Sequence, residues 1–170
     1  MDMDRAQRGG YTFAAKLVRG AYMVIERQHA KEHRIDDPIH DTIQNTHDNY
    51  NQGVQSVIER IAKGQRAEVM IATHNQDSVA HAVACMQQHG MDATSAPVYF
   101  GQLLGMADNL TFGLAHHKYK AYKYVPYGKV HEVMPYLIRR AQENSDALSG
   151  AQLALNMSRQ ELSRRITGSK

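Results

Sequence analysis

The chain lacks the features that mark secreted and membrane-spanning proteins. It has 170 residues and a single cysteine, Cys85, so no disulfide can form within it. The apolar sequence from Val79 to Met86 around this cysteine predicts a small buried residue and fits a reducing compartment. No apolar run approaches the roughly 20 residues of a membrane-spanning helix. The N-terminus begins Met-Asp-Met-Asp-Arg without an apolar core, so no targeting segment is readable in this chain.

Concentrated charge and familiar catalytic motifs are also missing. The 20 Lys and Arg residues and the 17 Asp and Glu residues are scattered together, so we expect no nucleic-acid partner. His29 and His33 stand four apart, but Glu32 directly precedes the second, which is not the H-E-x-x-H zinc motif, and we expect solvated histidines and no metal. Residues 101–105 lack the G-x-G-x-x-G spacing of a Rossmann fold. No Ser-His-Asp or Cys-His set is visible, which favours a reaction carried by a cofactor.

The apolar residues instead alternate between strand-like and helix-like patterns. Short runs rich in β-branched and aromatic residues predict strands, buried on both faces, at residues 14–22, 67–74, 97–103 and 121–125. Periodicity near 3.6 predicts helices at residues 41–62, 75–89, 131–140 and 152–165, with an irregular connection at 105–120. Either Asn75 or Asp77 can cap the second of these helices. Strand alternating with helix is typical of parallel βα units, so the predicted fold class is α/β.

Four βα units make half of an eight-stranded (β/α)8 barrel, which typically needs ~250 residues and at least ~200. We therefore interpret residues 1–170 as a single, partial domain, one half of a TIM-type barrel followed by a C-terminal helix. A half-barrel leaves two sheet edges open, so such a domain is expected to associate with further strands.

Polar residues gather at the predicted C-terminal end of every strand. Active sites of parallel barrels lie at that edge, where the strand ends converge. Each such residue taken alone is more often a turn or cap residue, but their coincidence on one edge favours a site. Gly20 lets a backbone approach a bulky ligand closely, and at least one of Lys16 and Arg19 is expected to enter the site as a cation. The groups suited to phosphate or ribose are those of Thr73, His74 and Asn75.

A second candidate site lies on the helix predicted from residue 131. Tyr136, Arg139, Arg140 and Glu143 recur at helical spacing, so they share one face. Guanidinium groups braced by a carboxylate can grip a planar anion through paired hydrogen bonds. An Arg-Arg pair is also common on solvated helix faces, and this alternative stays open. The helix follows directly on a strand that ends in a Pro-Gly turn, which favours a carboxylate-binding site.

Five of these segments together resemble the FAD-dependent proline dehydrogenase family. They are residues 16–22 (KLVRGAY), 72–75 (ATHN), 100–106 (FGQLLGM), 123–128 (KYVPYG) and 136–144 (YLIRRAQEN), in the order and spacing of that family. The similarity runs from about residue 5 to residue 165, and residues 38–47 (PIHDTIQNTH) are most similar to plant-type members.

The resemblance implies a distorted (β/α)8 barrel that holds FAD at the strand C-termini and oxidises L-proline to Δ1-pyrroline-5-carboxylate, with a quinone as electron acceptor. It places Lys16 near the flavin N5 and implies that Arg139 and Arg140 clamp the proline carboxylate, held in place by Glu143. The residues implied to wall the substrate ring are Leu103, Tyr124 and Tyr136. The residues implied to line the flavin are Val18, Arg19, Gly20, Ala21, Tyr22, Thr73, His74, Asn75 and Gln102.

The resemblance also concerns what lies outside the chain. It covers the C-terminal half of the family's barrel, so an N-terminal half-barrel that carries the family's catalytic lysine is an expected partner. In a eukaryote the implied location is the matrix side of the mitochondrial inner membrane, with peripheral association with that membrane. One departure from the family is the segment 116–119 (HHKY), where members usually have a Gln-Ala-Gly-Tyr-like turn.

Two alternative functions stay open at the level of the sequence. One is a non-catalytic half-barrel that serves as a binding or assembly piece. The other is a different carboxylate-binding barrel enzyme, which requires all five segment matches to be accidental. Flavin absorbance in the purified protein separates the leading hypothesis from the first alternative.

Overall fold

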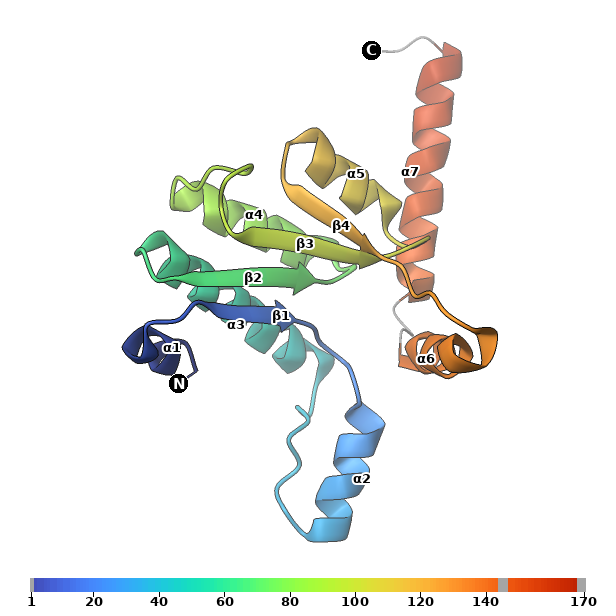
Figure 1. Cartoon of the computed structure of the whole chain (residues 1–170). Helices are drawn as coiled ribbons and strands as arrows, with labels where there is room; N and C mark the ends of the chain where they lie inside the picture. The colour runs from blue at the N-terminus through green and yellow to red at the C-terminus, as the bar shows by residue number, and fades with distance from the viewer. Residues whose placement is uncertain (1, 144–146, 168–170) are drawn as a thin grey trace.

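A parallel sheet with helices on one side forms the centre of the molecule. The computed structural model describes residues 2–143 and 147–167, with side-chain surroundings for residues 2–139 and 155–167. The strands are β1 (Phe13–Leu17), β2 (Ala67–Ala72), β3 (Val98–Leu103) and β4 (Lys120–Tyr124), in spatial order β1-β2-β3-β4 (Figure 1). Every neighbouring pair is parallel, which confirms the predicted α/β class. The helices are α1 (Asp2–Gly9), α2 (Met23–His33), α3 (Ile43–Ala62), α4 (Gln76–Gln88), α5 (Asp108–His116), α6 (Val130–Glu143) and α7 (Ala147–Thr167).

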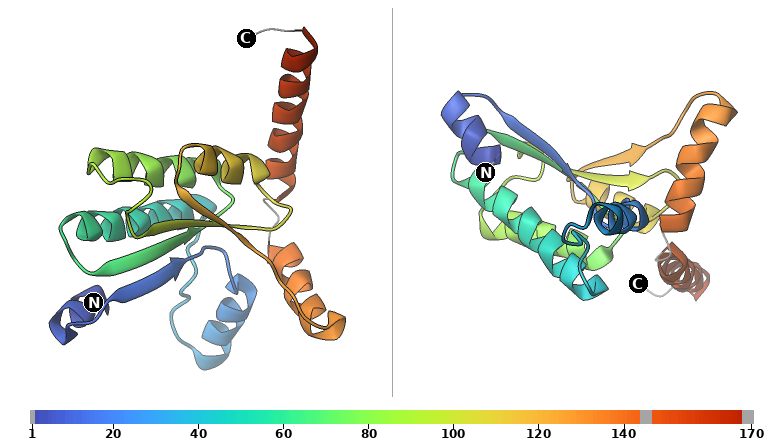
Figure 2. Two further views of the ribbon diagram at one scale, coloured as in Figure 1. Left: turned by 45° about the horizontal axis from the view of Figure 1, so that its top comes forward. Right: turned by 90° about the horizontal axis from the view of Figure 1, so that it is seen from below.

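The hydrophobic core lies between the sheet and the helices α3, α4 and α5, which cover one of its faces (Figure 2). Ile58 of α3 and Met86 of α4 are fully buried against Ile71 of β2 and Phe100 of β3. Burying a side chain of this size contributes about 1.5–3 kcal/mol to folding, so this layer holds the βα units together. Cys85 is buried in the same core, as predicted.

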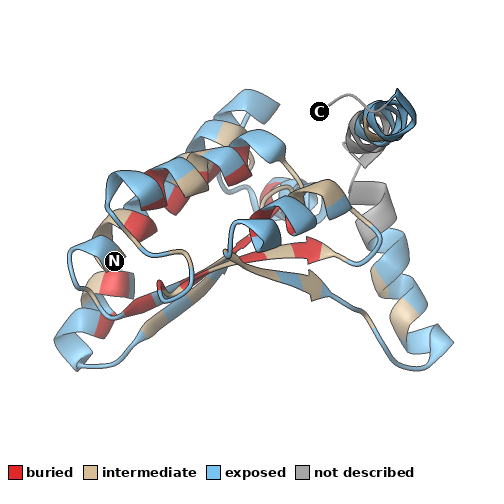
Figure 3. Ribbon diagram, turned by 90° about the horizontal axis from the view of Figure 1, so that it is seen from above, coloured by how far each residue is buried: buried red, intermediate tan, exposed pale blue. Residues whose placement is uncertain are grey.

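The opposite face of the sheet is uncovered in the part of the chain that the structure describes (Figure 3). Burial alternates along the strands: in β2, Val69 and Ile71 are buried while Glu68 is exposed, and in β1 Lys16 is exposed. The prediction of strands buried on both faces is therefore wrong for this chain, because helices pack on one side alone. We call the uncovered side the open face; it carries the side chains of Ala14, Lys16, Glu68, Met70, Ala72, Tyr99, Leu103, Lys120, Tyr122 and Tyr124 and the backbone of Gly101.

Both edges of the described sheet are free of strand partners, since β1 pairs with β2 alone and β4 with β3 alone. The sheet is thus an open, four-stranded segment of the barrel type rather than a closed barrel. Among the described residues, α2, α6 and α7 extend away from the helix layer that covers the sheet (Figure 1).

Two of the predicted strands end earlier than expected. The first strand stops at Leu17, and residues 18–22 form a loop in which Gly20 (φ 72°) and Tyr22 (φ 62°) adopt left-handed backbone conformations. A left-handed residue cannot continue a strand, and this turn leads directly into α2. The second strand stops at Ala72, which leaves Thr73, His74 and Asn75 as the connection to α4.

Three helices were not predicted, one of which is α5, where an irregular connection was expected at residues 105–120. The first, α1, is strongly polar, and Met3 and Ala6 are its buried residues, so its sequence shows little apolar periodicity. The second, α2, buries Ala30 alone among its residues and again has no apolar stripe to reveal it. The predicted helices at 41–62 and 75–89 are confirmed as α3 and α4 within two residues at each end.

The turn from α5 to β4 holds the segment that departs from the family pattern. Lys118 adopts a left-handed conformation (φ 67°), and the Tyr119 N–H donates to the Leu114 carbonyl at 3.0 Å. This is the hydrogen bond of a Schellman-type helix end, in which the left-handed position usually belongs to glycine. This chain therefore carries a lysine at a position whose backbone conformation favours glycine.

Candidate functional site

The C-terminal ends of the four strands bring the predicted polar residues together. Arg19 leaves the loop after β1 and reaches α4: its guanidinium donates to Ser78 Oγ at 3.0 Å and to Thr73 Oγ1 at 3.5 Å. The guanidinium also lies over the ring of Tyr50, 4.9 Å from its centroid. Arg19 therefore links the ends of β1 and β2 and is held in one orientation by a stacked ring and two hydroxyl groups.

Tyr50 supports this arrangement from helix α3. Its hydroxyl donates to the Leu17 carbonyl at 3.2 Å, at the last residue of β1. Burial raises the pKa of Tyr50 to about 12, against the opposing pull of the Arg19 charge. The phenol consequently stays protonated and keeps its donor on the end of β1. Neither Tyr50 nor Ser78 was predicted as part of the site, because each reads as an ordinary helix residue.

The connection from β2 to α4 organises the N-terminus of that helix. Asn75 is its N-cap, and Asn75 Oδ1 accepts from the Ser78 N–H at 2.9 Å. Thr73 Oγ1 accepts from the Asn75 N–H at 3.1 Å. Of the two predicted caps, Asn75 is thus the one used. The polar side chains order the turn, so that the positive end of the α4 dipole faces the C-terminal edge of the sheet.

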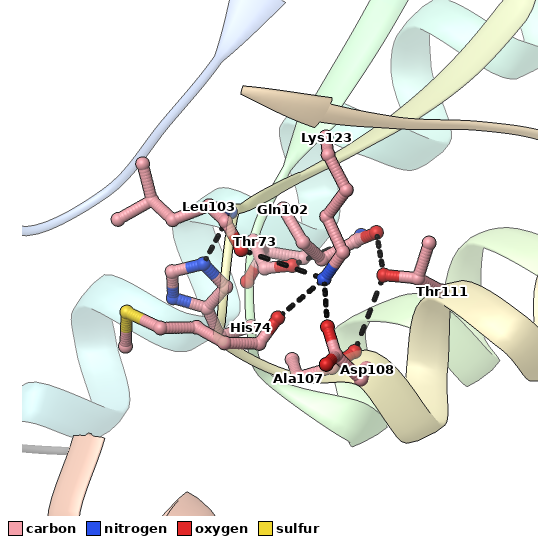
Figure 4. Close-up of polar contacts among 9 residues, drawn as sticks. Thr73, His74, Gln102, Leu103, Ala107, Asp108, Thr111 and Lys123 are labelled. Atoms are coloured by element: carbon pink, nitrogen blue, oxygen red, sulfur yellow. Dashed lines mark hydrogen bonds and ion pairs between the residues drawn. The ribbon is translucent and has the colours of Figure 1, made fainter. Parts of the chain in front are cut away.

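A buried hydrogen-bond network lies beneath this edge (Figure 4). Gln102 is almost fully buried on the helix side of β3, where its amide nitrogen donates to the Thr73 carbonyl at 3.3 Å and its Oε1 accepts from Thr111 Oγ1 at 3.0 Å. The side chain of Gln102 therefore supports the site from below, on the face opposite the open one. Thr111, on α5, completes the network and was not predicted.

His74 and Lys123 bind the next turn, between β3 and α5 (Figure 4). His74 Nε2 accepts from the Leu103 N–H at 3.0 Å. Lys123 Nζ donates to the carbonyls of Met106 at 2.6 Å and Leu103 at 3.4 Å, and pairs with Asp108 Oδ1 at 2.7 Å. Burial, and then the Lys123 charge, lower the pKa of His74, so the imidazole is neutral in this site. Lys123 lies in one of the five segments that carry the resemblance but was given no role there, and Asp108 was not predicted as part of the site.

On the open face, residues from four elements form an aromatic corner. Lys16 Nζ of β1 lies 5.4 Å from the centroid of the Tyr124 ring of β4. The rings of Tyr124 and Tyr136 are 5.8 Å apart and tilted by 50°, which joins α6 to the end of β4. Leu103 is the register partner of Tyr124 in the neighbouring strand. The structure therefore brings together the cation and all three of the residues that the resemblance implied as walls.

The predicted residues not yet described belong to α6 and to the loop between β1 and α2. Arg139 follows Tyr136 by one turn of α6 and is exposed. The side chains of Arg140 and Glu143 lie outside the described residues. Val18 is exposed, and Gly20, Ala21 and Tyr22 form the loop between β1 and α2. The structure thus joins Tyr136 to the corner directly and places Arg139 on the same helix beside it.

The histidine pair of α2 stands apart from this site. The rings of His29 and His33 stack at a centroid distance of 4.0 Å on an exposed helix. Throughout the part of the chain that the structure describes, no three His, Cys, Asp or Glu side chains gather in a way that could hold a metal ion. Within the same residues, no helix combines the length and apolarity that crossing a membrane requires.

Comparison with known proteins identifies relatives over nearly the whole chain. The family model described as proline dehydrogenase matches residues 1–152. The human protein named proline dehydrogenase 1, mitochondrial, is 44% identical over 166 residues, which cover 98% of this chain and 28% of the human protein. A Xenopus laevis hydroxyproline dehydrogenase is 43% identical over 167 residues, covering 98% of this chain and 36% of that protein. The Arabidopsis thaliana protein named proline dehydrogenase 2, mitochondrial, is 42% identical over 151 residues, covering 89% and 32%.

Solved structures support the fold. Proline utilization A from Bdellovibrio bacteriovorus, in the form inactivated by N-propargylglycine, superposes with a TM-score of 0.75 at 23% identity, covering 85% of this chain and 15% of that one. The same protein from Corynebacterium freiburgense gives a TM-score of 0.65 at 22% identity. The chain therefore spans about a third of its curated relatives and matches part of a TIM-type barrel in the solved structures.

Proposed function

Because the chain belongs to the proline dehydrogenase family, we propose that it forms part of an enzyme that oxidises L-proline to Δ1-pyrroline-5-carboxylate with FAD as cofactor. The observation that carries this proposal is the corner formed by Lys16, Leu103, Tyr124 and Tyr136 at the C-terminal edge of a parallel sheet. Barrel enzymes bind their substrates at that edge.

The residues present fit a flavin. Ala72 and Gly101 are register partners near the C-terminal ends of the two middle strands, on the open face, and neither has a side chain beyond Cβ. They leave a low floor on which a planar ring system can lie, with the flanking side chains of Lys16 and Leu103 at its sides. When bound, FAD supplies the acceptor for the hydride that leaves C5 of proline.

Positively charged groups are also available for the negatively charged pyrophosphate of FAD. The capped N-terminus of α4 carries a partial positive charge, and Arg19 lies beside it through its bond to Ser78. Phosphate groups bind readily at such helix ends. We propose that Arg19, with the turn of Thr73, His74 and Asn75, faces the pyrophosphate and ribose, while the loop of Val18, Gly20, Ala21 and Tyr22 passes along the cofactor.

The substrate is proposed to lie between the flavin and the aromatic corner. The ring of Tyr124 and the side chain of Leu103 offer apolar surfaces to the methylene groups of the pyrrolidine. Arg139 and Arg140, one helical turn beyond Tyr136, hold the carboxylate, and Glu143 braces their guanidinium groups. Fixing the carboxylate at one end and the ring against the aromatic walls sets the position of C5, which is the purpose of such a clamp.

The site needs a second wall, because the open face is uncovered and both sheet edges lack strand partners among the described residues. We propose that residues 1–170 act as one partial domain and that a second half-barrel completes the site. Backbone donors and acceptors of β1 and β4 would pair with its strands.

The proposed subcellular location is based on the names of the relatives. The human and Arabidopsis relatives are named as mitochondrial proteins, and we propose the same compartment for a eukaryotic source. A quinone at the matrix side of the inner membrane, reached by peripheral association, is the proposed electron acceptor.

One experiment decides between this proposal and a non-catalytic half-barrel. The protein in its full natural length is purified and assayed for L-proline-dependent reduction of a soluble quinone. Turnover that requires L-proline supports the proposal, whereas a flavin-free protein without turnover supports a binding or assembly role.

A further inference from the structure

Lys123 is a cation next to the site for which the proposed function has no role. Its neighbours Tyr122 and Tyr124 lie on the open face, so Lys123 points to the helix side of β4. Its side chain is 19% exposed, and Nζ contacts the Met106 carbonyl at 2.6 Å, Asp108 Oδ1 at 2.7 Å and the Leu103 carbonyl at 3.4 Å. Removing an ammonium group from water in this way is costly unless the group is fully engaged, and here three oxygens engage it.

Side chains hold both the N–H and the carbonyl of Leu103 (Figure 4). Its N–H donates to His74 Nε2 at 3.0 Å, and its carbonyl accepts from Lys123 and from the Met106 N–H at 3.1 Å. At this residue β3 stops being held by a regular ladder, and the chain turns toward α5. The direction of the Leu103 side chain thus depends on where Lys123 and His74 hold its backbone.

The same contacts determine the protonation of His74. An acceptor nitrogen carries no proton, so a ring whose Nε2 accepts from Leu103 is neutral and carries its hydrogen on Nδ1. The Lys123 ammonium, from the adjacent strand, disfavours a second positive charge on this ring. Nδ1 has no hydrogen-bond partner within the described residues, and it remains a donor at the C-terminal edge of the sheet.

We propose that Lys123 is a positioning residue of the proline pocket, which from behind the sheet holds the Leu103 peptide and the neutral, Nδ1-protonated form of His74. This inference rests on the proposed function, because that function makes Leu103 a wall of the pocket. Lys123 touches neither substrate nor cofactor and acts through Leu103 and His74.

The kinetic test compares three variants of the full-length, flavin-loaded enzyme. In Lys123→Met the KM for proline rises roughly 10-fold while kcat changes less than about threefold, since a pocket wall is displaced and the reacting atoms are not. Lys123→Arg keeps the charge and returns KM to within about threefold of the natural enzyme.

Lys120→Met is the matched control. Lys120 lies on the same strand and also donates to two carbonyls, those of Ser95 and Ala96, but at the opposite end of β4. Its loss affects stability alone and leaves KM unchanged. An unaltered KM in Lys123→Met, or an equal rise in Lys120→Met, overturns the proposal. If Lys123→Met does not fold, Asp108→Asn serves instead, because it removes the ion-pair partner of Lys123 at constant shape and is expected to raise KM by a smaller factor.

A second test does not depend on activity. Nitrogen-15 NMR of labelled histidine in the full-length protein reports which ring nitrogen carries the proton. The proposal requires a protonated Nδ1 and an unprotonated Nε2 on His74. In Lys123→Asn or Lys123→Met, the chemical shifts of the two ring nitrogens should move toward each other, as they do when a ring is not held in one protonation form. A proton on Nε2 in the natural protein overturns it. Absence of proline turnover with the expected tautomer contradicts the proposed function alone and leaves the hold on Leu103 and His74 supported.

Discussion

Lys16 and Tyr124 meet across the open face of the sheet, with the Lys16 ammonium 5.4 Å from the centre of the Tyr124 ring, although two strands separate β1 from β4. The contact is possible because a twisted parallel sheet curves toward this face, so that its outer strands approach each other at their C-terminal ends. Tyr136 joins from α6 with its ring 5.8 Å from that of Tyr124. The proposed substrate position follows from this meeting of a cation with two aromatic rings.

Tyr124 is expected to determine the choice between proline and its hydroxylated analogue. An aromatic ring packed on the pyrrolidine leaves little room for a hydroxyl group and offers it no partner. A pocket of this kind discriminates by about 10- to 200-fold, so the enzyme should prefer L-proline over trans-4-hydroxyproline by that order. Tyr124→Ser should narrow the difference, mainly by lowering kcat/KM for proline.

The measurement is kcat/KM for both substrates in both enzymes. Tyr127→Ser is the control, because Tyr127 is 92% exposed and lies three residues beyond Tyr124. An unchanged ratio in Tyr124→Ser would place its ring outside the substrate pocket.

Arg139 is expected to contribute to substrate binding. Arg139→Met removes a charge-assisted contact with the carboxylate worth about 1.5–3 kcal/mol, which corresponds to a 10- to 150-fold rise in the KM for proline. Arg140→Met should behave in the same way. Arg165→Met, which removes an exposed arginine paired with Glu161 on α7, should leave KM unchanged. If both clamp variants keep the natural KM, the carboxylate is held elsewhere.

The stability of the protein should fall on mild acidification because of His74. Its pKa is lowered in the folded state, by burial and by Lys123, so below about pH 6.5 the unfolded chain binds a proton that the folded chain resists. Stability contributed by the neutral ring is therefore present above that pH and is lost as pH falls toward the folded pKa. The charge that acts on His74 is that of Lys123, which is paired with Asp108.

Urea unfolding midpoints at about pH 7.5 and 5.5 test this expectation. The difference between the two midpoints should shrink in His74→Gln, which retains an acceptor but does not titrate. The exposed His117 supplies the control, and His117→Gln should preserve the full difference. An equal pH dependence in the natural protein and His74→Gln would show that His74 does not titrate in this range.

Lys118 should be replaceable by glycine with a gain in stability. Its left-handed backbone (φ 67°) costs a non-glycine residue about 1 kcal/mol, and glycine avoids that cost at the price of a more flexible unfolded chain. We expect Lys118→Gly to raise the free energy of unfolding by a few tenths to about 1 kcal/mol. His117→Gly, one residue earlier at φ −86°, should lower it. Destabilisation by Lys118→Gly would mean that the lysine side chain makes a compensating contact.

Periodicity predicted the strands, α3 and α4 because these elements bury apolar residues at regular spacing. It failed for α1, α2 and α5, whose buried residues are few. It also overestimated the burial of the strands: residues 69–72 of β2 form a continuous apolar run, yet the open face of this strand is uncovered in the described chain. The apolar sequence pattern shows which residues can be buried. The packing of the helices decides which face of the sheet is buried.

The candidate site, too, contains some residues that the sequence identified and others that it did not. The resemblance implied roles for Lys16, Leu103, Tyr124 and Tyr136, which the structure brings to one corner. It assigned no role to Tyr50, Ser78, Thr111 or Lys123, because the fold alone brings them to their partners, which are the Leu17 carbonyl, the Arg19 guanidinium, the Gln102 amide oxygen and the Met106 and Leu103 carbonyls. Lys123 is instructive: a lysine in a strand reads as solvent-exposed, and its burial becomes intelligible only once the Met106 and Leu103 carbonyls are seen to face it.

The measurement that tests the central claim most directly is the absorbance of the purified full-length protein before and after L-proline is added without oxygen. The account predicts a flavin band at about 450 nm that is lost when L-proline is added and is restored by a quinone. A protein that carries no flavin, or a flavin band that L-proline leaves unchanged, would contradict it.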